Sequence, residues 1–463
     1  MRDYLLLPLE LLGLFGVVEL PLLLLPLELP LVLPLGLLGE ELLPDAADGL
    51  FEVLLEPPAA DWSRWQPASA SARDAAMIIS TFMDPPVKGQ ASLQQTSGRR
   101  YHACAMKITA IDTCLLTVPT PKPMALQYPE HKLVVAELAT DEGLRGLGYS
   151  LVFNGGGAEA VLAYLDTRLK PALVGEDPLF VERLWEKMFR VDMGVRKQGI
   201  AGYALSALDI GLWDIAGKAA HLPLYKLWGA ASDRAGAYGS GGWAKYTIDE
   251  LIAEAEKYSA LGCKYYKMKI HHPDPAVNAS RVAAVKKVLG RGVRMMVDVN
   301  QGRDLIGNQR QARLLEEFDL LWYEEPVLAD DYDGYAEVAR SIRIPLAGGE
   351  NHFTRWEFKQ LFDRKSIQYA MPDVCRANGF SETLRIGKLA AAYGVALTPH
   401  LIHEIAIHVV GALSNGFLVE FMDWAPPDLF AELPECKDGF IRIPDKPGHG
   451  MTLHPKAITK YRR

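Results

Sequence analysis

Ionisable residues recur at similar intervals through the second half of the chain, each at or near the end of a short apolar run. They are Lys269, Asp298, Glu324, Glu350, Asp373, His400 and Glu420. Successive members are 20 to 29 residues apart. A single charge of this kind usually starts a surface loop, but seven in one register indicate that consecutive strand ends build a common site.

Three of these residues carry carboxylates and end successive predicted strands: Asp298, Glu324 and Glu350. No Cys or His stands next to them, and hard oxygen ligands favour Mg²⁺ over zinc. Helix capping or ion pairs with barrel lysines and arginines is the structural alternative. The trio predicts one Mg²⁺ per subunit.

Two lysines, Lys267 and Lys269, lie two residues apart on a predicted strand. Their side chains should therefore point to the same side, into the mouth of a barrel. A lysine beside another cation and a metal ion can have its pKa lowered towards neutrality, which makes it a usable general base. We expect one of the two to contact the substrate.

His400 and Asp373 end neighbouring predicted strands, so the carboxylate can orient the imidazole and favour its protonated form. The pair is a candidate acid or base. Glu420 ends the last predicted strand, where a protonated carboxyl would donate a hydrogen bond to developing negative charge.

The elements that position these residues alternate after Arg234 between short apolar strands and helical stretches, with a period of about 25 residues. Such a pattern implies right-handed βαβ units. Seven or eight units predict an α/β fold with a closed (β/α)₈, TIM-like barrel, and an open doubly wound sheet is the alternative. Strand-like runs at 106–118 and 131–140, then helical periodicity over 158–227, predict an N-terminal α+β capping domain.

We therefore expect four parts: an extension over 1–105, the capping domain over 106–230, the catalytic barrel over 231–425, and a C-terminal segment over 426–463 that packs on the capping domain. The extension begins with Leu and Pro near-repeats and reads as low-complexity, disordered sequence or as a mispredicted start. Glu10, Glu19 and Glu28 divide it into apolar runs too short for a membrane span. A membrane or partner anchor is the alternative use of this segment.

Charge and cysteine content exclude several classes of partner. The net charge of −8 has no basic block, so we expect no nucleic-acid partner, whereas a small anionic substrate needs only a local positive site. The short apolar runs of the extension likewise predict no membrane partner. The five cysteines are scattered and odd in number, as is typical of a reducing cytoplasm.

At this point the sequence resembles the enolase superfamily, and within it the mandelate racemase subgroup, across residues 106–461. The motifs that carry the resemblance occur in order: ALSALDIGLWDIAGKAAHLPLYKLWGA, KMKI, VDVNQG, YEEP, GGEN, MPD, TPHLIHEIAIH and the final Glu420. The resemblance implies Mg²⁺ on Asp298, Glu324 and Glu350, with Asn300 supporting the metal side. It also implies that such barrels assemble as homo-oligomers.

The same resemblance implies the catalytic roles. Lys269 would be the base on one face of the substrate and the Asp373–His400 pair the acid or base on the other. Lys267 and Glu420 would stabilise an enediolate. Together these groups would remove the α-proton of a carboxylate, which is too weakly acidic for one unaided side chain.

Substrate choice is expected to depend on two capping-domain loops, over 119–131 and 150–157. Lys122 and His131 are candidates for binding a polar or anionic end. Tyr128 and Phe153, with Met124, Leu126 and Leu151, are candidates for an apolar lining.

The expected reaction is dehydration of an acid sugar to a 2-keto-3-deoxy acid, which is a preference drawn from the family. A racemase or epimerase of a 2-hydroxy acid would use the same residues and stays open. A non-catalytic metal-binding barrel would keep the three carboxylates but have no need of Lys269 or His400, and both are present.

Overall fold

The computed structural model describes residues 4–7, 31–34, 106–121 and 128–462. The chain divides into two compact units, residues 1–99 and 100–463. In the first unit, β1 (Tyr4–Leu7) pairs antiparallel with β2 (Leu31–Pro34). The remainder of the extension predicted to be disordered lies outside the described residues.

An antiparallel three-stranded sheet opens the second unit, in the order β3 (Ile108–Pro119), β4 (Glu130–Thr140), β5 (Arg145–Val152). Helix α7 (Ile200–Ala219) packs so closely on β5 that a Cβ at Gly148 would lie 1.8 Å from the Ala207 carbonyl oxygen. Gly146 and Gly148 of β5 permit this close contact, and they also weaken the strand pattern in the sequence. The other α-helices of this domain are α4 (Ala158–Tyr164), α5 (Lys170–Leu173), α6 (Val181–Arg190) and α8 (Leu224–Leu227), and the π-helix η5 (Leu165–Leu169) joins α4 to α5.

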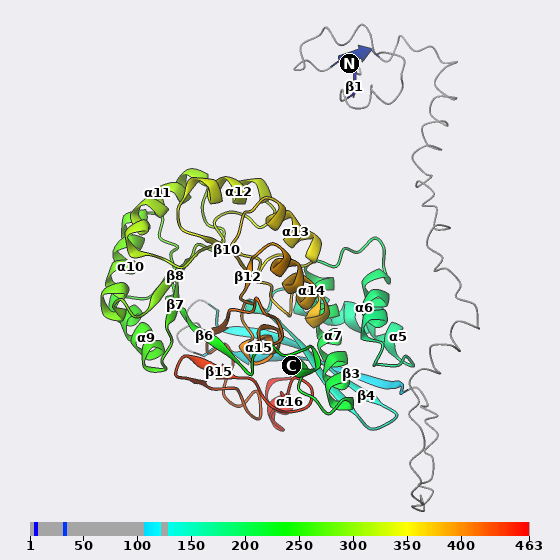
Figure 1. Ribbon diagram of the computed structural model, residues 1–463. Coiled ribbons are helices and arrows are strands. Elements are labelled where there is room, and N and C mark those ends of the chain that lie inside the picture. The colour runs from blue at the N-terminus through cyan, green and yellow to red at the C-terminus, as the bar shows by residue number, and fades with distance from the viewer. Residues whose placement is uncertain (1–3, 8–30, 35–105, 122–127, 463) are drawn as a thin grey trace, which may run out of the picture. The chain divides into compact units, whose positions relative to one another are not determined.

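Eight parallel strands, β6 to β13, form the barrel that the sequence predicts (Figure 1). Each strand pairs with its successor from β6 to β12, and β13 pairs with β6. The ring closes where the Phe417 amide donates to the Leu397 carbonyl at 2.8 Å, which links β12 to the start of β13. The open-sheet alternative is therefore wrong. The strands are β6 (Arg234–Gly241), β7 (Tyr265–Lys269), β8 (Arg294–Asp298), β9 (Tyr323–Glu324), β10 (Leu346–Gly348), β11 (Tyr369–Ala370), β12 (Ala396–Leu397) and β13 (Leu418–Phe421).

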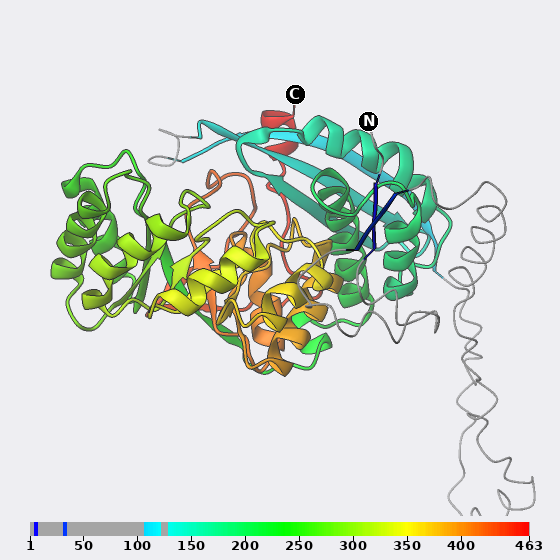
Figure 2. The same ribbon diagram turned by 90° about the horizontal axis from the view of Figure 1, so that it is seen from above.

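A helix follows each of the first seven strands and lies outside the ring (Figure 1). They are α9 (Ile248–Ala260), α10 (Pro275–Leu289), α11 (Leu305–Leu315), α12 (Tyr332–Ser341), α13 (Arg355–Asp363), α14 (Gly379–Ala392) and α15 (His403–Ala412). Figure 2 shows the three-stranded sheet along one side of this barrel. The Tyr149 hydroxyl of β5 donates a hydrogen bond to Glu404 of α15 at 2.7 Å, which joins the three-stranded sheet to the barrel.

The strand register brings the predicted site residues to one end of the barrel. Lys269 is the direct partner of Asp298 across β7 and β8, and Asp298 is the direct partner of Glu324 across β8 and β9. All three are the last residues of their strands. Side chains at the ends of adjacent parallel strands lie close together. Residues that are one βα unit apart in the sequence therefore meet in a single site.

The first barrel strand, β6, is absent from the strand-like runs recognised in the sequence. Its residues, RAGAYGSG, are too rich in glycine to give an apolar strand signal. The glycines are needed because a Cβ at Gly239 would lie 2.2 Å from the Tyr258 ring of α9. Close packing of α9 on β6 thus removes the side chains that would have revealed the strand.

The C-terminal segment contacts both parts of the unit. Strand β15 (Phe440–Arg442) pairs antiparallel with β6 and with β14 (Cys436–Lys437). The His449 imidazole contacts the Leu147 carbonyl of β5 at 2.7 Å, and α16 (Ala457–Tyr461) ends the described chain. No helix among the described residues is long and apolar enough to cross a membrane.

A buried carboxyl joins the capping domain to the barrel. Asp209 of α7 accepts hydrogen bonds from the Ser381 amide at 2.9 Å and the Ser381 hydroxyl at 2.6 Å, at the start of α14. Burial raises the pKa of Asp209 from 3.8 to about 7, although the bonds from Ser381 and the charge of Arg385 oppose this shift.

This raised pKa predicts a pH dependence of stability. Between about pH 4 and pH 7 the native state holds a proton that the unfolded chain has lost, so the free energy of unfolding should fall as pH rises through this window. In the wild type we expect the free energy of unfolding to fall by roughly 1 to 4 kcal/mol over this window. Asp209→Asn can keep the bond from the Ser381 amide, and its free energy of unfolding should not show this fall. Urea unfolding of both proteins from pH 5 to pH 8 measures this, and parallel profiles would contradict the assignment.

Candidate active site

A cavity of about 530 Å³ lies at the end of the barrel where the predicted site residues meet. Barrel residues that line it include Lys269, Glu350 and His400. Tyr128 and Phe153 of the capping domain also line it, with their ring centroids 4.8 Å apart. The site is therefore built by the barrel and covered by aromatic side chains from the first domain.

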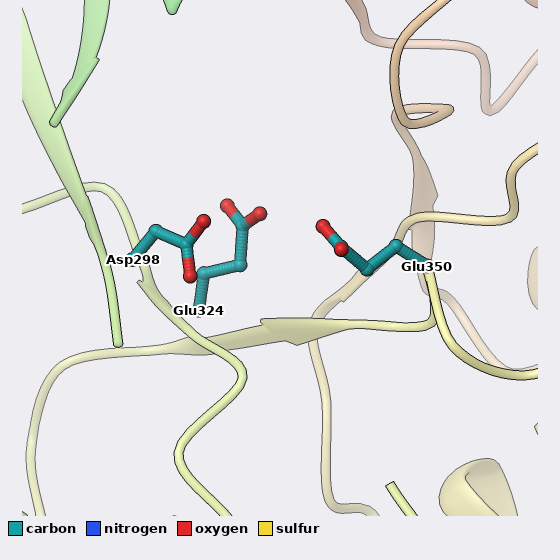
Figure 3. A group of neighbouring side chains, drawn as sticks. All are labelled: Asp298, Glu324 and Glu350. Carbon is teal, nitrogen blue, oxygen red and sulfur yellow. The ribbon is translucent and has the colours of Figure 1, made fainter. Parts of the chain in front are cut away.

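The three predicted metal ligands converge on one point. Each of Asp298, Glu324 and Glu350 offers an oxygen within 4.8 Å of the other two, and all three residues are buried. The carboxylates of Asp298 and Glu324 lie together, and that of Glu350 faces them (Figure 3). No other group of three or more such ligands occurs among the residues that the structure describes.

The electrostatics of this trio fit a hard divalent cation. Burial raises the pKa of Glu324 well above its ordinary value, and the Asp298 and Glu350 carboxylates add to this effect, whereas Lys267 opposes it. The Glu350 Oε2 atom is buried without a hydrogen-bond partner. An all-carboxylate donor set with an unpartnered buried oxygen suits Mg²⁺.

Asn300 lies beside the trio, as the sequence predicts. Its amide and its side-chain Nδ2 donate to the two Asp298 oxygens at 2.8 and 3.0 Å. The His271 imidazole contacts Asn300 Oδ1 at 2.8 Å, so the orientation of Asn300 is fixed from the other side. Asn300 thus positions Asp298, and it also lines the cavity.

The two lysines of β7 occupy different depths. Lys269 lines the cavity and donates to Asp298 Oδ2 at 2.7 Å. Lys267 is almost fully buried and donates to Glu324 Oε1 at 2.6 Å, with Glu420 Oε1 3.0 Å away. Lys269 is therefore the lysine placed to meet a substrate.

The direction of the Lys269 pKa differs from the lowered value expected from the sequence. Burial lowers the pKa of Lys269, but the Asp298 carboxylate raises it, and the net direction is upward. The cause is the 2.7 Å contact with Asp298, which the sequence does not show. A cation held by Asp298 would oppose this effect, because it would offset the charge of the carboxylate.

The predicted His400–Asp373 pair is formed. His400 Nδ1 and Asp373 Oδ2 are 2.8 Å apart, and the opposite ring nitrogen, Nε2, lies 3.3 Å from Glu350 Oε2. Asp373 also accepts from the Cys375 amide at 2.8 Å, which fixes the carboxylate. The ring is thus held by Asp373 with Nε2 directed towards the metal ligands.

Glu420 lies in the site, but not as the protonated donor that the sequence suggested. Burial disfavours its charged form, yet Lys267 and His400 lower the pKa of Glu420 far below its ordinary value. Its oxygens accept from the Ser240 hydroxyl at 2.6 Å and the Leu401 amide at 2.8 Å. As a carboxylate, Glu420 holds Lys267 and faces His400 rather than donating a proton.

Arg376 belongs to the site and is not predicted by the sequence analysis. Its guanidinium lies between two site carboxylates, with Nη1 3.4 Å from Glu350 Oε1 and Nε 3.3 Å from Asp373 Oδ2. Its Nη1 also donates to the Glu350 carbonyl at 3.0 Å. Arg376 does not end a strand, so the spacing of strand ends could not identify it. Its position three residues after Asp373 is the sequence feature that could have indicated an ion pair with that carboxylate.

Only some of the capping-domain residues predicted to bind the substrate line the cavity. His131 is fully buried, accepts from the Asn154 amide at 3.1 Å and stacks on Phe153, and burial lowers its pKa to about 4. It therefore supports Phe153 and is not placed to bind an anion. Leu151 belongs to β5 and is buried in the hydrophobic core. Lys122, Met124 and Leu126 lie outside the described residues.

Family models match most of the second unit. Residues 107–229 match the N-terminal domain of the mandelate racemase/muconate lactonizing enzyme family, and residues 250–457 match the enolase C-terminal domain-like family. The chain belongs to the mandelate racemase/muconate lactonizing enzyme family. The resemblance and the barrel-with-capping-domain fold expected from the sequence are confirmed.

Relatives of this chain include a cycloisomerase and dehydratases. The 3,6-anhydro-α-L-galactonate cycloisomerase of Streptomyces coelicolor is 33% identical, over 70% of this chain and 90% of its own length. The arabinonate dehydratase of Saccharolobus solfataricus is also 33% identical, over 72% of this chain and 92% of its own length.

A solved structure of the family agrees with the fold. The L-talarate dehydratase of Polaromonas sp. JS666, crystallised with Mg and L-glucarate, is 34% identical. Its TM-score is 0.72, over 77% of this chain and 98% of that one.

Proposed function

We propose that this protein is a Mg²⁺-dependent dehydratase of acid sugars. The observation that carries the proposal is that Lys269 lies 2.7 Å from Asp298, whereas His400, held by Asp373, lies 3.3 Å from Glu350. The Glu350 carboxylate faces the carboxylates of Asp298 and Glu324 (Figure 3). Relatives named as arabinonate and L-talarate dehydratases support it. Bound Mg²⁺ would supply positive charge that polarises the substrate carboxylate and acidifies its α-hydrogen.

In the proposed reaction, Lys269 takes the hydrogen from C2 as a proton, and the electron pair of the C–H bond passes into an enediolate. Lys267 supplies a fixed positive charge beneath the site, where Glu324 and Glu420 hold it. His400 gives a proton to the hydroxyl on C3, the C–O bond breaks, and water leaves. The resulting enol takes a proton at C3 and becomes the 2-keto-3-deoxy acid.

The racemase alternative uses the same residues. Lys269 would remove the C2 proton from one face and His400 would return a proton to the opposite face of the same carbon. The relative named as a cycloisomerase is also an isomerase, so this alternative has support in the comparisons. The two reactions differ in whether the C3–O bond breaks.

Product analysis separates them. The Mg²⁺-loaded enzyme would be incubated in D₂O with a panel of aldonates, aldarates and mandelate-like acids, followed by NMR and a keto-acid assay. The proposal predicts a 2-keto-3-deoxy acid with deuterium at C3. Inverted acid with deuterium at C2 and no keto acid would instead establish the racemase, and no turnover of any acid would contradict both.

We further propose a homo-oligomer in a reducing cytoplasm. The family resemblance supports the first, and light scattering after size-exclusion chromatography tests it. The second is supported by the five cysteines of the sequence, which are scattered and odd in number.

A further inference from the structure

Arg303 lines the active-site cavity and lies two residues before α11 begins. Its Nη2 donates to the His272 carbonyl at 2.7 Å, which holds the side chain along the cavity wall. Its Nε is buried without a hydrogen-bond partner. The reaction proposed above leaves this arginine without a role.

The charge of Arg303 is not compensated as the other cavity cations are. Lys269 pairs with Asp298 at 2.7 Å, and Arg376 pairs with Glu350 and Asp373 at 3.4 and 3.3 Å. Among the residues that the structure describes, no Asp or Glu oxygen lies within 4.0 Å of the Arg303 guanidinium. A partly enclosed arginine with spare donors and no carboxylate is suited to an anionic group on a ligand.

The surroundings strengthen such an interaction. Tyr128, Phe153 and Trp243 line the same cavity, and Trp243 is almost fully buried. Aromatic walls exclude water and lower the local dielectric constant, which makes a charge pair more favourable. The cavity of about 530 Å³ is in the size range of small-molecule sites and has room for a six-carbon acid.

We propose that Arg303 binds the far carboxylate of an aldarate, a sugar diacid, and that the enzyme therefore prefers diacids to aldonates. This assignment rests on the proposed function, because it takes the near carboxylate to lie at Asp298, Glu324 and Glu350. An aldonate carries a neutral hydroxymethyl group where an aldarate of the same length carries its second carboxylate. The guanidinium distinguishes the two, since it forms a charge-assisted, two-bond contact only with the carboxylate.

The test compares pairs of acids that differ only at C6: galactarate with D-galactonate, and D-glucarate with D-gluconate. Values of kcat/KM are measured for the wild type, Arg303→Gln and Arg303→Lys. Arg310→Gln is the matched control, because Arg310 is an exposed arginine on α11 outside the cavity lining. Calorimetric binding of the same acids to Mg²⁺-loaded Lys269→Ala, with and without Arg303→Gln, gives a readout that needs no turnover.

We expect the wild type to prefer the diacid, and Arg303→Gln to lose about 10- to 100-fold for the diacid while its aldonate value changes about twofold or less. Arg303→Lys should recover part of the loss, and the control should match the wild type. Equal losses on both acids, or a wild-type preference for aldonates, would overturn the assignment and leave the dehydratase intact. Turnover of neither acid together with tighter binding of the diacid would support the Arg303 site and contradict the dehydratase, whereas absence of diacid binding would overturn the Arg303 site.

Discussion

Lys269→Ala is expected to lower kcat by about 10²- to 10⁴-fold, because it removes the group placed to take the C2 proton. His400→Asn should lower product formation by a similar factor. The two variants should differ in exchange, since Lys269 acts before His400 in the proposed reaction. His400→Asn should still exchange the C2 hydrogen with D₂O, whereas Lys269→Ala should not.

Steady-state kinetics and NMR of the recovered acid measure these effects. Lys287→Ala is the matched control, because Lys287 is an exposed lysine on α10 and does not line the cavity. Lys269→Ala within about tenfold of the wild type would exclude Lys269 as the base. Loss of exchange in both variants would show that the two residues act in one step rather than in sequence.

Mg²⁺ should raise the melting temperature of the wild type and leave that of Glu350→Gln nearly unchanged. A ligand at one hundred times its Kd stabilises the native state by about 2.7 kcal/mol. Without Mg²⁺, Glu350→Gln should be at least as stable as the wild type, because it removes one of three buried carboxylates whose oxygens lie within 4.8 Å. Its turnover should be lost, since the trio no longer holds the cation.

Scanning fluorimetry with and without Mg²⁺, after treatment with a chelator, measures this difference. Glu337→Gln is the control, because Glu337 is an exposed acid on α12. A Mg²⁺-dependent rise in Glu350→Gln equal to that of the wild type would place the metal site elsewhere. A large destabilisation of chelated Glu350→Gln would show that the Arg376–Glu350 contact outweighs the repulsion.

The barrel and its strand-end residues are predictable from the sequence because both follow from chain periodicity. Each βα unit returns the chain to the same end of the barrel, so Lys269, Asp298 and Glu324 become direct neighbours by register alone. The His400–Asp373 contact follows from adjacency of β11 and β12. These features need no knowledge of side-chain packing.

Features set by packing are the ones that the sequence does not show. Strands β5 and β6 are glycine-rich because helices press against them, so their apolar pattern is weak. Arg376 enters the site from a loop. The ionised state of Glu420 depends on Lys267 and His400, which lie far from it in the sequence. Burial of His131 likewise depends on how the capping domain folds.

The most direct test of the central claim is whether the C2–H bond breaks at this site. An accepted acid carrying deuterium at C2 would be converted in H₂O by the Mg²⁺-loaded enzyme, and the label would be followed by NMR in substrate, product and solvent. Loss of C2 deuterium to the solvent, abolished in Lys269→Ala and by chelation, is the predicted result. A product that keeps its C2 deuterium, or label loss independent of Lys269 and Mg²⁺, would contradict the account.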